Sequence, residues 1–356
     1  MRVLLLSAYD AASHQRWRRA LTDGISDWDW TTLTLPPRHF GWRVRGNPLS
    51  WHREPVLQKR FDLVLATSMV DLATLRGLLP ALAGTPTALY FHENQFAYPE
   101  GRGEHGLLEA QMVSLYSAIA ADSLLFNSAY NRDSFLAGCR ALLKRLPDAV
   151  PAGVPDALAE KAQVLPVPVD IVHTGTRGDP GGPLEIVWNH RWEYDKGPEL
   201  LLTLCEELAE SDVGFRMHLV GQQFRERPEA FARVERLLAG IGALGECGFI
   251  EDLQRYHQLL SRVDVVLSTA RHDFQGLSVI EAVRLGASPV VPDALVYPEW
   301  LDAEYRFATG RDAVARLRWL AAQKHKGESL PTPDLQGFDS SNLLPRYRKV
   351  LAAMAA

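Results

Sequence analysis

Short runs of apolar residues alternate with helix-like segments along most of the 356-residue chain. The runs that read as strands are 2–9, 61–67, 87–92 and 122–128 in the first half, and 184–190, 215–221, 264–269 and 287–291 in the second. Strands that are apolar on both faces and separated by helices are typical of parallel sheets covered by helices on both sides. The pattern therefore predicts an α/β protein of the doubly wound type.

A Gly/Pro-rich stretch, HTGTRGDPGGP, separates the two series of strands and cannot hold a helix or a central strand. A chain of 356 residues is also too long for one ordinary domain. We predict one Rossmann-like domain at 1–172, a linker at 173–183 and a second at 184–356. Ligands of such domains bind at the carboxyl ends of the strands, so function is expected in the loops that follow the apolar runs.

Composition excludes several classes of protein. The formal net charge of -5 provides no global basic field for nonspecific contact with nucleic acid or an anionic membrane. The three cysteines lack CxxC spacing, which fits a reduced compartment and argues against a thiolate zinc site. No apolar stretch approaches the length of a membrane span, and positions 3–6 are too short for a signal peptide. A cytoplasmic protein with no membrane partner is expected.

The stretch NHRWEYDKGPE places Arg191 and Lys196 on a loop between a strand and a helix that begins at Gly197–Pro198. Two cations beside the N–H groups of a helix N-terminus form a site for a diphosphate. The alternative is a solvated loop in which these cations pair with Glu193 or Asp195.

The stretch STARHDFQGLSVIEAV carries Asp273 and Gly276 on a loop and Glu281 in the helix that follows. Carboxylates suit the hydroxyls of a sugar or ribose, and the N–H groups of residues 276–278, which include Leu277, suit phosphate oxygens. The alternative for Glu281 is a solvated helical carboxylate.

In the first half, FHENQFAYP places His92, Glu93, Asn94 and Gln95 at the end of an apolar strand. Adjacent strand residues point to opposite faces, so His92 and Glu93 are poor joint ligands for one metal. No other His and carboxylate cluster stands at ligand spacing, and we expect no metal. The polar residues either face a ligand or are satisfied by local hydrogen bonds.

Two further stretches are candidates for an acceptor site. SAYDAASHQRW places Ser13 and His14 after the first strand, and residues 36–60 interleave cations with aromatic residues, among them Trp42, Arg43 and Arg45, around the single acid Glu54. Cations for phosphates and aromatic rings for bases suit single-stranded RNA. The alternative is a basic loop that packs its tryptophans onto its own domain. We expect this segment to lie beside His92.

The second half resembles the donor-binding domain of retaining GT-B glycosyltransferases. The resemblance rests on Asp273 and Glu281, with seven residues between them, and on the upstream Arg191 and Lys196. In that family the first acidic residue is Glu, where this chain has Asp273. The resemblance also covers CGFIEDLQRYHQLLSRVDVVLSTARHDFQGLSVIEA and implies that the turn at Phe249 lies near the nucleobase of the donor.

Three motifs, YFHENQFAYP, NHRWEYDKGPE and ALVYPEW, resemble the tRNA-queuosine mannosyltransferases, and this likeness runs over nearly the whole chain. Where that family has Gly-Gly-Ser-His after the first strand, this chain has Ala11 and Ala12 before Ser13 and His14. The resemblance implies the GT-B fold, two Rossmann-like domains facing an interdomain cleft. It also implies metal-independent, retaining transfer of mannose from GDP-mannose to the queuosine base in the anticodon region of a tRNA, without a cofactor.

The expected site residues fall into three groups. Those expected to act in catalysis are His92, Arg191, Lys196 and Glu281. Those expected to bind the donor are Arg191, Lys196, Phe249, Asp273, Gly276, Leu277 and Glu281. Those expected to bind the acceptor are Ser13, His14, Trp42, Arg43, Arg45, Glu93, Asn94 and Gln95. In this scheme Arg191 and Lys196 neutralise the leaving diphosphate.

Three alternatives remain open from the sequence. The chain is a GT-B glycosyltransferase with a glycan, lipid or small-molecule acceptor, a nucleotide-sugar epimerase, or a noncatalytic protein that binds RNA or a nucleotide sugar. Incubation with GDP-mannose distinguishes them, because transfer or hydrolysis releases GDP, epimerisation changes only the sugar, and a binding protein changes nothing.

Overall fold

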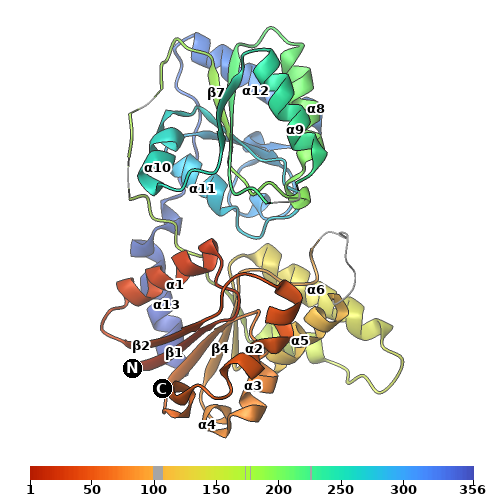
Figure 1. Cartoon of the computed structure of the whole chain (residues 1–356), viewed down its shortest axis with the longest axis vertical. Coiled ribbons are helices and arrows are strands. Elements are labelled where there is room, and N and C mark those ends of the chain that lie inside the picture. Colours follow the sequence, from red (N-terminus) through yellow and green to blue (C-terminus); the bar gives the residue numbers. More distant parts are fainter. Residues whose placement is uncertain (99–106, 173, 177, 225–226) are drawn as a thin grey trace. The chain divides into compact units, whose positions relative to one another are not determined.

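The computed structural model describes residues 1–98, 107–172, 174–176, 178–224 and 227–356. The chain divides into two compact units (Figure 1). Unit 1 comprises Met1–Pro168 and Phe338–Ala356, and unit 2 comprises Val169–Gly337. Each unit contains one sheet of six parallel strands, which confirms the prediction of two α/β domains.

The strands of unit 1 run in the order β2-β1-β3-β4-β5-β6, and α1 packs beside α13 on the sheet (Figure 1). The strands are β1 (Arg2–Ser7), β2 (Asp29–Thr34), β3 (Leu63–Thr67), β4 (Thr87–Phe91), β5 (Ser123–Phe126) and β6 (Ala162–Val164). The helices are α1 (Ala12–Gly24), α2 (Phe40–Trp51), α3 (Leu72–Leu78), α4 (Pro80–Ala83), α5 (Leu107–Ala120), α6 (Ala129–Arg145), α7 (Val154–Glu160) and α13 (Ser340–Met354).

The strands of unit 2 run in the order β9-β8-β7-β10-β11-β12, with α8 and α9 on one side and α10 and α11 on the other (Figure 1). The strands are β7 (Leu184–Trp188), β8 (Phe215–Val220), β9 (Leu244–Gly248), β10 (Val265–Leu267), β11 (Ser288–Pro292) and β12 (Arg306–Phe307). The helices are α8 (Pro198–Ala209), α9 (Glu229–Gly240), α10 (Leu253–Arg262), α11 (Leu277–Arg284) and α12 (Gly310–His325).

All eight strands predicted from the sequence are present, and four strands were missed. The missed strands β2, β6, β9 and β12 are the outermost strands of the two sheets. An edge strand is not buried on both faces, so it lacks the continuous apolar run by which the central strands were recognised. β2 and β9 illustrate this, because each is only partly buried along its length.

The basic segment 36–60, which the alternative interpretation describes as a loop, contains the helix α2. Its helical character was hidden by Pro48, which removes one backbone donor from the helix interior. The carbonyl of Val44, left without that donor, accepts a hydrogen bond from the Asn47 side-chain amide at 3.0 Å. The same amide also lies 3.1 Å from the Met69 carbonyl, so Asn47 compensates for the missing donor and connects the helix to the loop after β3.

The C-terminal helix α13 belongs to unit 1, whereas the sequence placed the whole of 184–356 in the second domain. The buried Tyr347 explains this position. Its hydroxyl lies 2.9 Å from Trp17 Nε1, 3.0 Å from the Tyr90 hydroxyl and 3.0 Å from the Pro166 carbonyl. The expected linker 173–183 lies in unit 2, and its residues 173 and 177 are outside the described residues.

Replacement of Tyr347 by Phe is predicted to lower the free energy of unfolding by about 1–3 kcal/mol, because the buried Trp17 N–H loses its acceptor. Chemical denaturation followed by circular dichroism measures the loss. The matched control is Tyr116→Phe, since Tyr116 is exposed and its hydroxyl is expected to contribute little. An equal effect of the two substitutions would contradict the assigned role of Tyr347.

Candidate active site

The two strand orders locate the candidate site before any side chain is considered. In a doubly wound sheet, ligands bind at the carboxyl ends of the strands, at the point where the order reverses. In unit 1 this point lies between β1 and β3, and in unit 2 it lies between β7 and β10. The loops after β7 and β10 carry four of the residues singled out in the sequence, which are Arg191, Lys196, Asp273 and Gly276.

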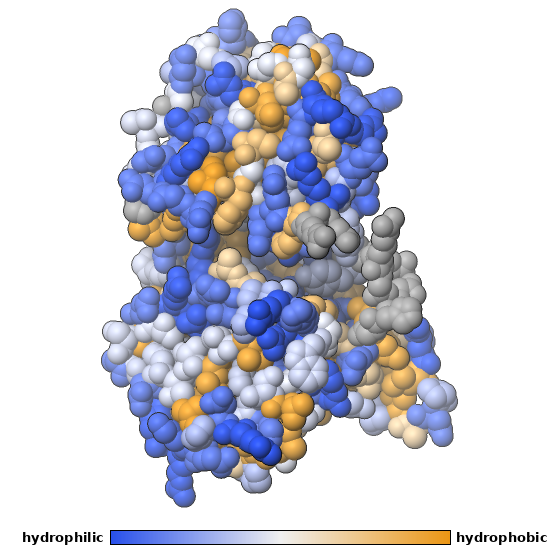
Figure 2. Space-filling model, viewed as in Figure 1, coloured by the Kyte–Doolittle hydropathy of each residue, from blue (hydrophilic) through white to orange (hydrophobic). Residues whose placement is uncertain are grey.

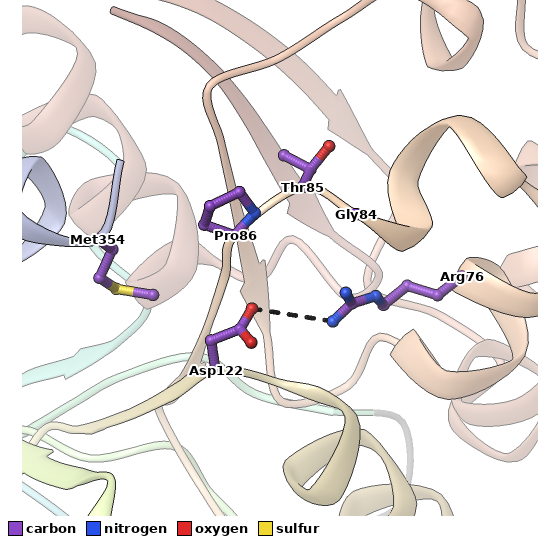
Figure 3. Close-up of a pocket in the computed structure, with 6 residues that line it drawn as sticks. All are labelled: Arg76, Gly84, Thr85, Pro86, Asp122 and Met354. Carbon is purple, nitrogen blue, oxygen red and sulfur yellow. Dashed lines mark ion pairs between the residues drawn. The ribbon is translucent and has the colours of Figure 1, made fainter. Parts of the chain in front are cut away.

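Two surface pockets lie at the opposite, amino edges of the sheets. One, of about 340 Å³, is lined by residues that include Arg76, Thr85 and Asp122, with Arg76 extending toward the Asp122 carboxylate (Figure 3). Asp122 immediately precedes β5, and its carboxylate accepts the N–H of Thr87, the first residue of β4. The other, of about 660 Å³, adjoins the start of β7. Neither lies where ligands of this fold class bind.

In unit 2, the loop after β7 and the loop after β10 interlock. The Lys196 ammonium donates to the His272 carbonyl at 2.5 Å, and the Arg271 N–H donates to the Asp195 carbonyl at 2.8 Å. The Thr269 hydroxyl donates to the Lys196 carbonyl at 2.8 Å. Lys196 is therefore almost entirely buried and held in place by the second loop.

Gly197 makes this interlock sterically possible. It has a φ of +65°, and a Cβ at this position would lie 2.0 Å from the Thr269 carbonyl oxygen. Any other residue would clash with backbone that cannot move aside without separating the loops.

Arg191 forms ion pairs with Glu193 and Asp195, the two partners that the sequence offered for it. Its guanidinium lies 2.8 Å from Glu193 and 3.7 Å from Asp195, and Asp195 also lies 3.3 Å from the Lys196 ammonium. The Arg191 side chain is nevertheless 47% exposed, so it reaches solvent at the carboxyl edge of the sheet.

Asp273 closes the turn that begins α11. One carboxylate oxygen accepts the Gly276 N–H at 3.0 Å, and the other accepts the Tyr297 hydroxyl at 3.1 Å. Burial disfavours the charged form of Asp273, but Lys196 and His190 outweigh it and hold the pKa of this carboxyl below its usual value. The sequence motif ALVYPEW contributes Tyr297 to this site, a role that was not predicted.

Glu281 is linked through Tyr256 to Asn189, the residue that follows β7. Its side chain is buried, and a carboxylate oxygen lies 3.4 Å from the Tyr256 hydroxyl. That hydroxyl accepts the Asn189 amide at 3.0 Å, and the same amide donates to the Ser278 carbonyl at 2.8 Å. The alternative of a solvated helical carboxylate is therefore wrong.

His190, which sequence reasoning missed, occupies the centre of this group. It is the second residue after β7, and its Nδ1 lies 3.3 Å from the Ser278 hydroxyl in the first turn of α11. Burial, together with the nearby Lys196, lowers the pKa of His190 to about 4. The imidazole is therefore uncharged at neutral pH. The sequence could have identified His190 as a site residue, because it immediately precedes Arg191.

The remaining donor candidates lie at the same edge. Gly276 has a φ of +74° and precedes Leu277, the first residue of α11. Phe249 follows β9 and is 64% exposed, so its ring is available to a ligand.

In unit 1, His92 is buried in a cluster of rings at the end of β4. His14 stacks on it with ring centroids 4.1 Å apart, and Trp17 and Tyr90 meet it edge-on at 4.8 and 4.7 Å. Burial and the neighbouring His14 hold the pKa of His92 well below its usual value. Within the described residues, its Nε2 has no hydrogen-bond partner.

The other polar residues after β4 differ in burial and in their hydrogen bonds. Asn94 is buried and donates to Asn131 Oδ1 at 2.8 Å, while its own oxygen accepts the Phe96 N–H at 2.9 Å, so it holds the loop rather than facing a ligand. Gln95 is also buried. Glu93 is only half-buried and accepts the Tyr98 hydroxyl at 2.9 Å.

The residues after β1 lie beside this cluster. His14 shares a 2.5 Å hydrogen bond between its Nδ1 and the Tyr9 carbonyl, and Ser13 is half-buried in the first turn of α1. Burial lowers the pKa of His14, against the opposing charge of Glu93. The ring of Tyr9 meets Phe40, at the start of α2, with centroids 6.0 Å apart. Tyr9 and His14 thus link Phe40 of the basic segment indirectly to His92.

The three acceptor candidates on α2 differ in availability. Trp42 is 51% exposed, with its other face over Gly46. Arg43 is half-buried, and its Nε donates to the Pro36 carbonyl at 3.3 Å. Arg45 forms an ion pair with the buried Asp71 and lies 3.1 Å from the Thr74 hydroxyl, so its guanidinium joins α2 to α3.

Among the residues that the structure describes, no three His, Cys, Asp or Glu side chains are grouped so that they could hold a metal ion. No helix of the described chain is long and apolar enough to cross a bilayer. The face of each unit visible in Figure 2 is a mixture of hydrophilic, intermediate and apolar side chains, with the apolar ones in separate patches.

Comparison with known proteins gives two family matches. Residues 2–169 match the family described as tRNA-queuosine alpha-mannosyltransferase N-terminal, and residues 176–316 match the glycosyl transferases group 1. A tRNA-queuosine alpha-mannosyltransferase of Drosophila melanogaster is 30% identical over 361 residues, which cover 97% of this chain and 95% of the relative.

Solved structures share the whole fold. Anabaena Alr3699/HepE in complex with UDP and glucose superposes with a TM-score of 0.67 at 15% identity, over 99% of this chain and 100% of that one. A sucrose-phosphate synthase from Thermosynechococcus elongatus gives 0.65 at 13% identity, over 99% and 100%. At this identity the likeness shows the fold alone, which is the predicted GT-B class.

The depressed pKa of His190 predicts how stability depends on pH. The unfolded chain takes up a proton at this residue near pH 6.5, whereas the folded chain does so only near pH 4. The contribution of His190 should therefore lower the free energy of unfolding by about 2–3 kcal/mol as pH is lowered from about 6.5 to about 4. Chemical denaturation at pH 7 and pH 4.5 should show a smaller difference in His190→Gln. The control, His325→Gln, removes an exposed imidazole, and an equally flattened profile there would contradict the assignment.

Proposed function

The chain belongs to the tRNA-queuosine alpha-mannosyltransferase family, and from this we propose that it transfers mannose from GDP-mannose to the queuosine base in the anticodon region of a tRNA. The observation that carries the donor half of the proposal is the pair Arg191 and Lys196 at the switch point of the unit 2 sheet. We further propose that the reaction takes place in the cytoplasm, where tRNA is modified and free thiols persist.

In the proposed donor site, the diphosphate lies between the two cations and the first turn of α11. The N–H groups of Leu277 and Ser278 are free of intrahelical partners by their position in that turn and suit phosphate oxygens. Lys196 and Arg191 then neutralise the charge that develops on GDP as the glycosidic bond breaks. This stabilisation grows in the transition state, so it accelerates the chemical step.

The sugar and nucleobase ends of the donor have separate candidates. Glu281, buried beside Asn189 and Tyr256, is proposed to bind mannose hydroxyls. The exposed ring of Phe249 suits stacking against guanine. Asp273 acts mainly through the turn it closes, because both of its oxygens are engaged within the protein.

No metal is required in this scheme, because the two cations supply the charge that Mg²⁺ supplies in other transferases. The product is proposed to be α-linked, with retention of configuration, as in the GT-B enzymes that the chain resembles.

The acceptor is proposed to bind unit 1. Trp42 offers one ring face to a base, and Arg43 lies one residue further along the same helix. The basic segment 36–60 also contains the exposed cations Arg38, Arg53, Lys59 and Arg60. Arg45 is not among the contacts we propose, because its guanidinium pairs with Asp71. His92 and His14, both uncharged at neutral pH, line the adjoining edge with Ser13 and Glu93 and orient the acceptor.

The direct test is mass spectrometry of queuosine-containing tRNA after incubation with the protein and GDP-mannose. The queuosine nucleoside is expected to gain the mass of one hexose, and to gain it equally in EDTA. Lys196→Ala should lower the rate by on the order of 10²–10³, through loss of charge stabilisation in the transition state. Its control is Lys326→Ala, which removes a lysine from the C-terminal end of α12.

Several outcomes would contradict parts of the proposal. A hexose added to a glycan or small molecule, but not to tRNA, would overturn the acceptor. Conversion of the sugar without release of GDP would indicate an epimerase. Loss of transfer in EDTA, with recovery on addition of Mg²⁺, would show that the cations alone are insufficient.

The acceptor surface has its own prediction. Trp42→Ala should weaken tRNA binding by roughly 1–3 kcal/mol if a base stacks on the ring, and Arg43→Gln should flatten the dependence of binding on salt by removing a phosphate contact. Filter binding at several salt concentrations measures both. The matched control is Trp319→Ala, an exposed tryptophan on α12 of unit 2. Equal losses from Trp42→Ala and Trp319→Ala would exclude a specific role for α2.

A further inference from the structure

Asp195 is a buried carboxylate placed between the two cations of the proposed donor site. Its side chain is only 3% exposed, and Oδ2 lies 3.3 Å from the Lys196 ammonium and 3.7 Å from the Arg191 guanidinium. Neither carboxylate oxygen accepts a hydrogen bond from the residues that the structure describes. Asp195 is therefore stabilised in the interior by charge, not by hydrogen bonds.

The carboxylate is fixed in this position by the interlocked loops. The Asp195 carbonyl accepts the Arg271 N–H at 2.8 Å, and the adjacent Lys196 ammonium donates to the His272 carbonyl. Asp195 and Lys196 lie in the same short turn, Tyr194–Lys196, so neither moves without the other.

A negative charge in this position has two opposite effects on a diphosphate. It reduces the repulsion between Lys196 and Arg191 and so keeps them together in the empty site. It also repels the diphosphate, and this repulsion is strong because water is excluded from around the carboxylate. Since the interlocked loops already hold Lys196, we expect the repulsion to outweigh the organising effect.

We propose that Asp195 is the resident counter-charge of the Arg191–Lys196 pair, and that it limits the affinity of the site for nucleoside diphosphates so that the product GDP can leave. This inference rests on the proposed function, because it takes the two cations to be the diphosphate site. It identifies a residue that tunes the site without contacting the sugar.

Glu193 provides a matched comparison within the same loop. It pairs with the same guanidinium at a shorter distance, 2.8 Å, but its side chain is 32% exposed. An ion pair in contact with water is screened, so removal of this charge should matter much less to a bound anion.

The experiment compares Asp195→Asn with Glu193→Gln, each of which removes one negative charge and keeps the shape of the side chain. Isothermal titration calorimetry with GDP should show on the order of tenfold tighter binding to Asp195→Asn, and a change of less than about threefold for Glu193→Gln. Unchanged or weaker binding of GDP by folded Asp195→Asn overturns the proposal, as does equal tightening in both variants.

Thermal unfolding provides a second measurement if Asp195→Asn is less stable. Saturating GDP should then raise the melting temperature of this variant more than that of the unchanged protein, because the anion replaces the missing charge. A smaller rise overturns the counter-charge role.

The same titration distinguishes failure of this inference from failure of the proposed function. If the unchanged protein binds no GDP, the diphosphate site and the inference both fall. If it binds GDP but Asp195→Asn binds no more tightly, only the counter-charge role falls.

Discussion

The site of unit 2 depends on the contact between the Lys196 ammonium and the His272 carbonyl. This contact joins the loop after β7 to the loop after β10, across the point where the strand order reverses. Gly197 allows the two backbones to approach each other, and the Thr269 hydroxyl joins the loops by donating to the Lys196 carbonyl. Because the ammonium is already positioned, a diphosphate in the proposed site would not have to order a flexible lysine, which would reduce the entropic cost of binding.

Unit 1 places its candidate residues by a different means. Where unit 2 uses charge and backbone contacts, unit 1 packs His92 among the rings of His14, Trp17 and Tyr90. The hydroxyl of Tyr347 is hydrogen-bonded to both Trp17 and Tyr90, so α13 helps to hold the ring cluster in place. The two units thus supply a charged site and an uncharged one, which suits an anionic donor and a separate acceptor-orienting surface.

The sequence predicted the parts of the fold that are determined locally. Central strands were recognisable because both of their faces are buried, and edge strands such as β2 were not. Arg191, Lys196 and Glu281 were identified because cations and acids recur at strand ends near helix starts. The contacts of Arg45 and Asn94 could not be predicted, because Asp71 and Asn131, their partners, are distant in sequence. The place of α13 in unit 1 could not be predicted for the same reason. It depends on contacts between residues far apart in the sequence, such as Tyr347 and Tyr90, which are separated by more than 250 positions.

The most direct test of the central claim is a crystal structure of the protein soaked with GDP-mannose. We predict diphosphate oxygens within hydrogen-bond distance of Lys196 and Arg191, at the N-terminus of α11, with the mannose toward Glu281. A diphosphate bound at the amino edge of either sheet, or one that contacts neither cation, would contradict the account.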